Sequence, residues 1–169
     1  VQWLIVPRHP NRFDEVARLL QDAGLRVARR SAWQGDVPVA ADVWLGDSMG
    51  EMAAYYTLAD VVLLGGSFAP LGGQNLIEAA ACGCPVVVGP HTFNFAQATE
   101  LACEAGAAWR TPGLPAAADK ALALVQHPHD LEKARAAATA FAQAHRGAAR
   151  ATARQVADLL GVAASSAKD

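Results

Sequence analysis

The stretch that decides the fold reads VVLLGGSFAPLGGQNLIEAAA, from Val61 to Ala81. It opens with an apolar run that is too short for a helix and is typical of a strand buried on both faces of a parallel sheet. It ends in small and apolar residues that suit a closely packed helix. Two Gly-Gly pairs, at 65–66 and 72–73, permit positive φ and a close approach of a ligand to the backbone. Because a helix that begins at such a loop directs free N–H groups and the positive end of its dipole outward, we expect an anion site here.

Two polar side chains at the start of this predicted helix allow two interpretations. Asn75 lies at the N-cap position and Glu78 follows three residues later, so the pair can be a capping arrangement that only starts the helix. Alternatively, Glu78 binds a pair of ligand hydroxyls, as acidic residues do for ribose, while the helix terminus faces a phosphate. The spacing leaves both interpretations open, and one carboxylate can do both jobs in turn.

Size and composition exclude several classes of protein. At 169 residues the chain fits one domain, and its net charge of −2 without any run of Lys and Arg argues against a nucleic-acid partner. No apolar stretch approaches the roughly 20 residues needed to cross a bilayer, so we expect a soluble chain. The three cysteines lack the spacing of a zinc site, and we expect small, reduced, buried thiols and no metal.

Strands and helices are predicted to alternate along the first two thirds of the chain. The expected strands are 2–6, which we place inside the sheet, 25–29, 43–45, 60–64, 85–88 and 107–110. The expected helices are 12–23 with Asn11 as N-cap, 52–58 opened by a capping box of Ser48 and Glu51, the helix that ends at Cys82, and 96–105. This order predicts an α/β fold, a Rossmann-like doubly wound parallel sheet of about six strands with helices on both faces.

The remainder of the chain is Ala-rich, and its helices are expected at 114–126, 128–145 and 148–160. We expect a single domain over 1–169, with an α/β core over 1–112, a helical tail over 113–162 and a frayed end over 163–169. The chain opens inside a predicted strand and without Met, so we expect a fragment of a longer protein.

Polar residues follow several of the predicted strands, on the edge where ligands bind in doubly wound sheets. Arg8 follows the first strand and suits a bidentate phosphate contact, although a surface ion pair is the alternative. The segment Ser48–Glu51 follows the third strand, and Ser67 with the Gly-rich loop follows the fourth. His91 and Asn94 follow the fifth, where His91 is expected to cap a loop. We expect these loops to gather Arg8, Glu51 and Glu78 at one rim of the sheet.

The absence of several known motifs argues against some classes of reaction. The sequence has no GxGxxG after its first strand, no GxxxxGK[ST], no G-x-S-x-G and no H-E-x-x-H. Dinucleotide oxidoreduction, P-loop phosphoryl transfer and serine hydrolysis therefore lose support. The remaining interpretation is a nucleotide-binding site, in which a glutamate holds the ribose and a helix terminus holds the phosphate.

Four separated motifs resemble, in order and spacing, the C-terminal half of the 3-deoxy-D-manno-octulosonic acid (Kdo) transferase family. They are PRHPNRF from Pro7, GDSMGE from Gly46, GGS from Gly65 with GGQNLIEAA from Gly72, and GPHTFNF from Gly89. The resemblance extends from about Val1 to Arg110. Two positions depart from the family pattern, since Gln74 and Leu76 stand where the family usually has His and Pro around Asn75.

The resemblance implies the donor-binding half of a GT-B glycosyltransferase. Such an enzyme transfers Kdo from CMP-Kdo to a lipid A precursor at the cytoplasmic face of the inner membrane of Gram-negative bacteria, without a cofactor or metal. An N-terminal acceptor-binding domain would supply the general base and the membrane association, so this chain alone would bind CMP weakly and transfer no sugar. Arg8 would stabilise the leaving group. The implied CMP contacts are Pro7, Arg8, Met49, Gly50, Glu51, Asn75, Leu76, Ile77 and Glu78.

Two other functions remain open at this point. A GT-B transferase or an epimerase that uses a UDP-sugar shares the glutamate on the ribose. A non-catalytic nucleotide-binding scaffold domain would need the same loops without the chemistry.

Overall fold

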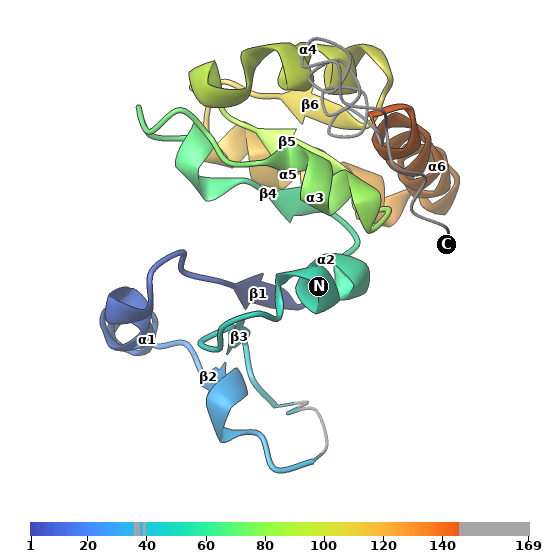
Figure 1. Cartoon of the computed structure of the whole chain (residues 1–169). Helices are drawn as coiled ribbons and strands as arrows, with labels where there is room; N and C mark the ends of the chain where they lie inside the picture. Colours follow the sequence, from blue (N-terminus) through green and yellow to red (C-terminus); the bar gives the residue numbers. More distant parts are fainter. Residues whose placement is uncertain (36–37, 39, 146–169) are drawn as a thin grey trace, which may run out of the picture. The chain divides into compact units, whose positions relative to one another are not determined.

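The computed structural model describes residues 1–35, 38 and 40–145 of the chain (Figure 1). The chain divides into two compact units, Val1–Met52 and Ala53–Asp169. Each unit has its own parallel sheet of three strands. The six parallel strands predicted from the sequence are therefore present, but they form two sheets where we expected one.

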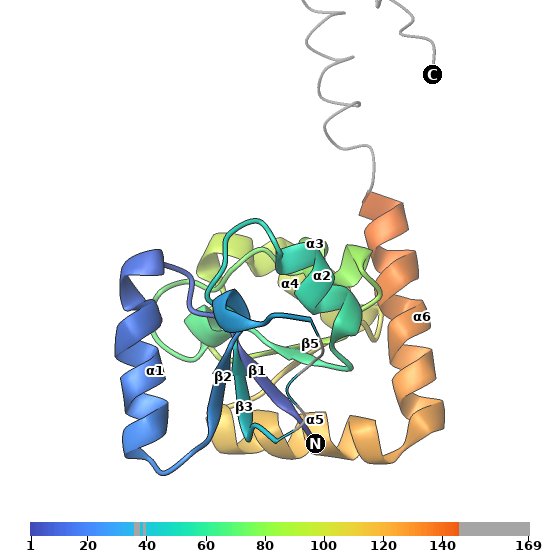
Figure 2. The same cartoon turned by 90° about the horizontal axis from the view of Figure 1, so that it is seen from below.

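The first unit is built on the sheet β1-β3-β2, whose strands lie side by side in Figure 2. Its strands are β1 (Trp3–Ile5), β2 (Val27–Arg29) and β3 (Val43–Leu45), and Ile5 and Arg29 both pair with Leu45. Val43 and Leu45 are buried because β3 has a neighbour on each side. The expectation that the first strand is interior was wrong for this sheet, since β3 is central and Trp3 on β1 is 41% exposed.

Helix α1 (Phe13–Asp22) connects β1 to β2 in the first unit. A 3-10 turn over Pro10–Arg12 precedes it, and Arg12 occupies the N-cap position without a side-chain hydrogen bond. The prediction of Asn11 as the N-cap was wrong, because the turn that starts at Pro10 contains Asn11. A second 3-10 turn, Arg30–Ala32, follows β2 directly.

The second unit is built on the sheet β4-β5-β6, again parallel throughout. Its strands are β4 (Val62–Leu63), β5 (Val86–Val88) and β6 (Ala108–Arg110), and the three valines of the central strand β5 are buried. The helices of the unit are α2 (Met52–Leu58, whose first residue ends the first unit), α3 (Leu76–Ala81), α4 (Ala96–Glu104), α5 (Leu114–Gln126) and α6 (Pro128–His145). Figure 2 shows α3 and α4 on one side of this sheet and α5 on the other.

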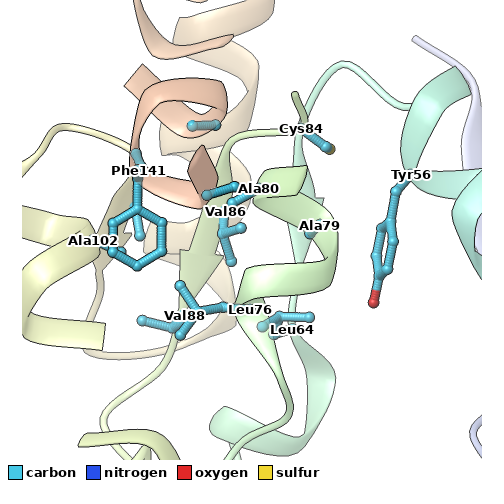
Figure 3. Close-up of a cluster of buried hydrophobic side chains, with 14 residues drawn as sticks. Tyr56, Leu64, Leu76, Ala79, Ala80, Cys84, Val86, Val88, Ala102 and Phe141 are labelled. Atoms are coloured by element: carbon cyan, nitrogen blue, oxygen red, sulfur yellow. The ribbon is translucent and has the colours of Figure 1, made fainter. Parts of the chain in front are cut away.

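The core of the second unit lies between its sheet and the helices α3 and α6 (Figure 3). Ala79 and Ala80 of α3 and Ala138 of α6 are buried, and their small side chains let the two helices pack closely. Phe141 of α6 fills the space beside them, and Leu76, Val86 and Val88 complete the cluster. The helices expected as a tail after residue 112 are thus part of this core as far as His145. The predicted helix 148–160 and the end 163–169 lie outside the described residues.

No helix in the described part of the chain is both long enough and apolar enough to span a bilayer.

Candidate functional site

The start of α3 confirms one of the two interpretations of Asn75. Its side-chain oxygen accepts a hydrogen bond from the backbone N–H of Ile77 at 3.1 Å, which makes Asn75 the N-cap. Its side-chain nitrogen donates to Oε1 of Glu78 at 3.0 Å. Glu78 is exposed, so the amide orients a carboxylate that still faces solvent. Helix capping therefore occupies Asn75 and leaves Glu78 oriented for a further contact.

Leu76 and Ile77 differ in what they can offer a ligand. The Leu76 side chain is only 1% exposed and belongs to the core, so Leu76 can meet a ligand only through its backbone. Leu76 thus contributes apolar burial at the first residue of α3. Ile77 is half-buried, and its backbone N–H is already engaged by Asn75.

The Gly-rich loop between β4 and α3 is fastened to the loop that follows β5. Asn94 donates from its backbone N–H to the carbonyl of Gly72 at 3.1 Å and from its side chain to the carbonyl of Leu71 at 3.2 Å. Gly72 has φ of 84°, and a Cβ there would lie 2.3 Å from the Asn94 side chain and 2.6 Å from the Phe93 ring. The space that the glycine leaves free is therefore filled by the neighbouring loop, where the sequence had suggested a ligand.

Ser67 holds the same two loops together from inside. Its hydroxyl donates to the carbonyl of Leu64 at 2.5 Å and accepts from the N–H of Gly89 at 2.7 Å. Its carbonyl accepts from the backbone N–H of His91 at 3.0 Å. His91 therefore fastens the loop, as expected, through its backbone. These contacts lie at the carboxyl ends of β4 and β5, so they fix the edge of the sheet from which α3 starts.

A second group of predicted residues lies in the first unit. Gly46, directly after β3, donates its N–H to the carbonyl of Ile5 at the end of β1 at 2.8 Å, so the loops after these two strands start side by side. Pro7 is half-buried and Arg8 is exposed. Within residues 1–35, 38 and 40–145, no ion pair engages the Arg8 guanidinium, so the surface ion pair that we considered as an alternative is not found in these ranges.

The loop after β3 presents Met49 and Gly50 between two anchored residues. Met49 is 69% exposed, and Gly50 has φ of 81°, a conformation that favours glycine. Glu51 accepts a hydrogen bond from Nη2 of Arg30 at 2.9 Å, and the Ser48 hydroxyl donates to its other oxygen. Helix α2 begins at Met52, directly after Glu51. The capping of this helix by Ser48 stays a prediction.

Sequence reasoning missed Asp47, the buried carboxylate at the other end of this loop. Its side chain is 1% exposed and accepts hydrogen bonds from Nε of Arg29 at 2.6 Å, from the Ser31 N–H at 2.8 Å and from the Ser31 hydroxyl at 2.7 Å. Burial by itself raises the pKa of Asp47, but the hydrogen bonds from Ser31 and Arg29 outweigh it and bring the pKa below its ordinary value. The sequence did offer a signal for this contact. Arg29-Arg30-Ser31 stands at the end of one predicted strand, and Asp47 stands just after the end of the next predicted strand.

Cysteine and metal chemistry receive no support in the described part of the chain. Cys82, Cys84 and Cys103 are free, and burial raises the pKa of the Cys84 thiol to about 12, so that it stays protonated. No group of three or more His, Cys, Asp or Glu residues within the described ranges could hold a metal ion.

The structure thus gives one group of predicted residues in each unit. Pro7, Arg8, Met49, Gly50 and Glu51 lie at the carboxyl edge of the first sheet, and Asn75, Leu76, Ile77 and Glu78 lie beyond the carboxyl end of β4 in the second. The expectation that Arg8, Glu51 and Glu78 share a single rim stays a prediction, because each unit is described by itself.

Known proteins resemble this chain over most of its length. No family model matches it. The crystal structure of the C-terminal CMP-Kdo binding domain of WaaA from Acinetobacter baumannii superimposes with a TM-score of 0.77 at 36% identity, covering 83% of this chain and 72% of that one. The Kdo transferase of Bordetella pertussis matches 94% of this chain at 54% identity. The chain belongs to the Kdo transferase family. The resemblance predicted from the four sequence motifs is therefore confirmed, and the α/β fold with it.

Curated members of the Kdo transferase family are similar in sequence. The Kdo transferase of Bordetella pertussis is 54% identical over 158 residues, which cover 94% of this chain and 37% of that protein. The Kdo transferase of Haemophilus influenzae is 42% identical over 102 residues, which cover 60% of this chain and 23% of that protein. The chain therefore spans little more than a third of the first of these relatives and less than a quarter of the second.

Proposed function

We propose that this chain is the donor-binding domain of a glycosyltransferase that transfers Kdo from CMP-Kdo to a lipid A precursor in lipopolysaccharide biosynthesis. The observation that carries the proposal is the likeness to the WaaA domain, which is described as a CMP-Kdo binding domain and is 36% identical over 83% of this chain. The two groups of loop residues at the carboxyl ends of parallel strands support it, since ligands of such sheets bind there.

The residues of the two groups suit different parts of CMP. The exposed Arg8 guanidinium is free to bind the phosphate, and Met49 and Gly50 offer an apolar side chain and accessible backbone to the nucleoside. Glu78, oriented by Asn75, can accept hydrogen bonds from the ribose hydroxyls. The proposed contacts are Pro7, Arg8, Met49, Gly50, Glu51, Asn75, Leu76 through its backbone, Ile77 and Glu78.

Arg8 has a role in the transfer step as well. When the bond between Kdo and the CMP phosphate breaks, its electron pair stays on the phosphate oxygen, and the acceptor hydroxyl forms the new bond to the sugar as it loses a proton. Arg8 stabilises the charge that grows on the phosphate. The base that takes the proton belongs to an N-terminal acceptor-binding domain. The reaction needs no cofactor or metal from this chain.

The same proposal covers the domains and the substrates of the full-length protein. This chain forms one half of a GT-B enzyme, and the N-terminal half binds the lipid acceptor and associates with the cytoplasmic face of the inner membrane. CMP-Kdo and the lipid A precursor are its substrates, and nucleic acid is not a partner.

Replacing Glu78 by Ala tests the proposal on the 169-residue chain. We expect Glu78→Ala to weaken CMP binding about tenfold, the scale of a lost hydrogen bond to a charged group, and to leave the melting temperature nearly unchanged, since Glu78 is exposed. Calorimetric titration and thermal melts measure the two effects. The matched control is Glu104→Ala, another exposed glutamate, which should change neither.

Unchanged CMP affinity in Glu78→Ala would contradict the assignment of the ribose contact. Complementation of a Kdo-deficient strain by the full-length gene tests the transfer itself. A gene that fails to complement while its product still binds CMP would favour a non-catalytic scaffold.

A further inference from the structure

The segment Arg29–Ser31, which begins with the last residue of β2, contacts both ends of the loop that follows β3. At the first end, Asp47 is buried and accepts three hydrogen bonds from Arg29 and Ser31. Arg29 also donates from Nη1 to Asp14 of α1 at 2.7 Å, so the same guanidinium ties the loop to the helix. The start of the loop therefore has little freedom to move relative to the sheet.

At the second end, Arg30 holds Glu51. Its Nη2 donates to Oε1 of Glu51 at 2.9 Å, and its guanidinium carbon lies 5.5 Å from the centroid of the Trp33 ring. Trp33 in turn packs edge-on against Trp44 of β3, with ring centroids 5.5 Å apart. The two tryptophans thus position the Arg30 guanidinium relative to the central strand β3. The guanidinium in turn positions the Glu51 carboxylate.

Met49 and Gly50 lie between these two anchors. Glu51 accepts from Ser48 with one oxygen and from Arg30 with the other, which closes a short turn around Met49 and Gly50. Arg30 also offsets the charge of Glu51, so an anionic ligand that approaches Met49 and Gly50 meets an ion pair in place of an isolated carboxylate.

We propose that Arg30 is a positioning residue for nucleotide binding: it holds Glu51, and through Glu51 the turn Ser48–Glu51, in the shape that receives the nucleotide of the donor. This inference rests on the proposed function, since the turn carries three of the proposed CMP contacts. Arg30 acts through Glu51, and it is distinct from Arg8, which contacts the phosphate itself.

A double-mutant cycle on the 169-residue chain tests the inference. The variants are Arg30→Ala, Glu51→Ala, both together, and Arg30→Lys, with CMP affinity measured by calorimetry and folding by thermal melts. The matched control is Arg26→Ala. Arg26 directly precedes β2, at the opposite end of the strand from Arg30, and it also pairs with a carboxylate, that of Asp42.

We expect Arg30→Ala to weaken CMP binding about fivefold to tenfold in the wild-type background and less than twofold in the Glu51→Ala background. Arg30→Lys should recover part of the loss because it keeps the charge but lacks the planar fork. Arg26→Ala should bind CMP like the wild type. A role confined to folding would lower the melting temperature without making the CMP effect depend on Glu51.

Two results would overturn the inference. The first is wild-type affinity in both Arg30→Ala and Arg30→Lys, and the second is an equal loss on removing Arg30 whether or not Glu51 is present. If Arg30→Ala does not fold, Arg30→Lys in the two backgrounds provides the same comparison. A wild-type chain that binds no CMP would instead overturn the proposed function, and this inference with it.

Discussion

Asp47 is a carboxylate whose environment sets a pH dependence for the first unit. Its hydrogen bonds from Ser31 and Arg29 outweigh its burial and lower its pKa in the folded chain. A carboxyl group with a lowered folded pKa stabilises the fold above its unfolded pKa, near 3.9, and this stabilisation is lost as the pH falls through the folded value. The contribution of Asp47 is therefore complete at pH 7 and absent in strong acid.

We expect Asp47→Asn to lower the free energy of unfolding by about 1–3 kcal/mol at pH 7, because Ser31 and Arg29 lose the buried, charged acceptor of their hydrogen bonds. The difference from the wild type should shrink as the pH is lowered from 7 toward 2, because protonation of Asp47 removes the charged acceptor from the wild type as well. Urea unfolding at the two pH values measures it. Asp22→Asn, at an exposed carboxylate, is the control. A difference that stays constant with pH would contradict this account of Asp47.

Asn75 and Arg30 differ in whether their contacts could be predicted from the sequence. The capping role of Asn75 is local, because its oxygen bonds to an N–H two residues on, and residue type and spacing predicted it. The contact between Arg30 and Glu51 joins residues 21 positions apart through the pairing of two strands. Nothing local marks it, so the positioning residues could be found only once the strands were placed.

At the scale of elements, the two loops beyond β4 and β5 behave as one piece. Ser67 bonds to Gly89 and His91, and Asn94 bonds to Leu71 and Gly72. The start of α3 therefore depends on the loop after β5, although that loop carries none of the proposed nucleotide contacts.

This dependence predicts a strong effect at Gly89. A Cβ there would lie 2.4 Å from the Ser67 carbonyl oxygen and 2.7 Å from the Phe68 ring, and the carbonyl is backbone that cannot move away. We expect Gly89→Ala to lower the free energy of unfolding by about 1–3 kcal/mol, the cost of overpacking, and to weaken CMP binding as the loops shift. Chemical unfolding and calorimetric titration measure the two effects.

Gly65→Ala is the control in the unfolding experiment, since a Cβ at Gly65 meets no atom within 4 Å. Equal stability of the two variants would mean that the loops after β4 and β5 are not held together as described.

The positions of strands and helices followed from the sequence more closely than their contacts did. Helix α2 was predicted over 52–58 and is found at Met52–Leu58, because alternating polar and apolar segments mark such elements locally. The N-cap of α1 was assigned to the wrong residue because Pro10 opens a 3-10 turn that residue preferences do not distinguish from the helix itself. The division into two sheets was also missed, since pairing of strands depends on contacts between distant residues.

At the scale of the whole molecule, the chain carries its proposed contacts in two units, each with a parallel sheet whose carboxyl edge bears a polar loop. Helices α5 and α6, which the sequence suggested as a tail, supply buried residues to the second unit, among them Ala117, Leu124 and Phe141. Truncation after residue 112 would therefore remove part of the core rather than an appendage.

The proposed division of labour between domains predicts that the 169-residue chain binds the donor and does not transfer it. We expect no Kdo transfer to a lipid A precursor by the isolated chain, because we propose that the base that deprotonates the acceptor belongs to an N-terminal domain. Chromatography of the lipid product after incubation with CMP-Kdo measures it. Robust transfer by the isolated chain would show that the base lies within these residues.

The central claim is that this chain recognises the cytidine nucleotide of the donor. Titrating the wild-type chain with CMP and with UDP under the same conditions tests it most directly. The account predicts saturable CMP binding at least about tenfold tighter than UDP binding, a difference of roughly 1.4 kcal/mol. Equal or tighter binding of UDP would contradict it.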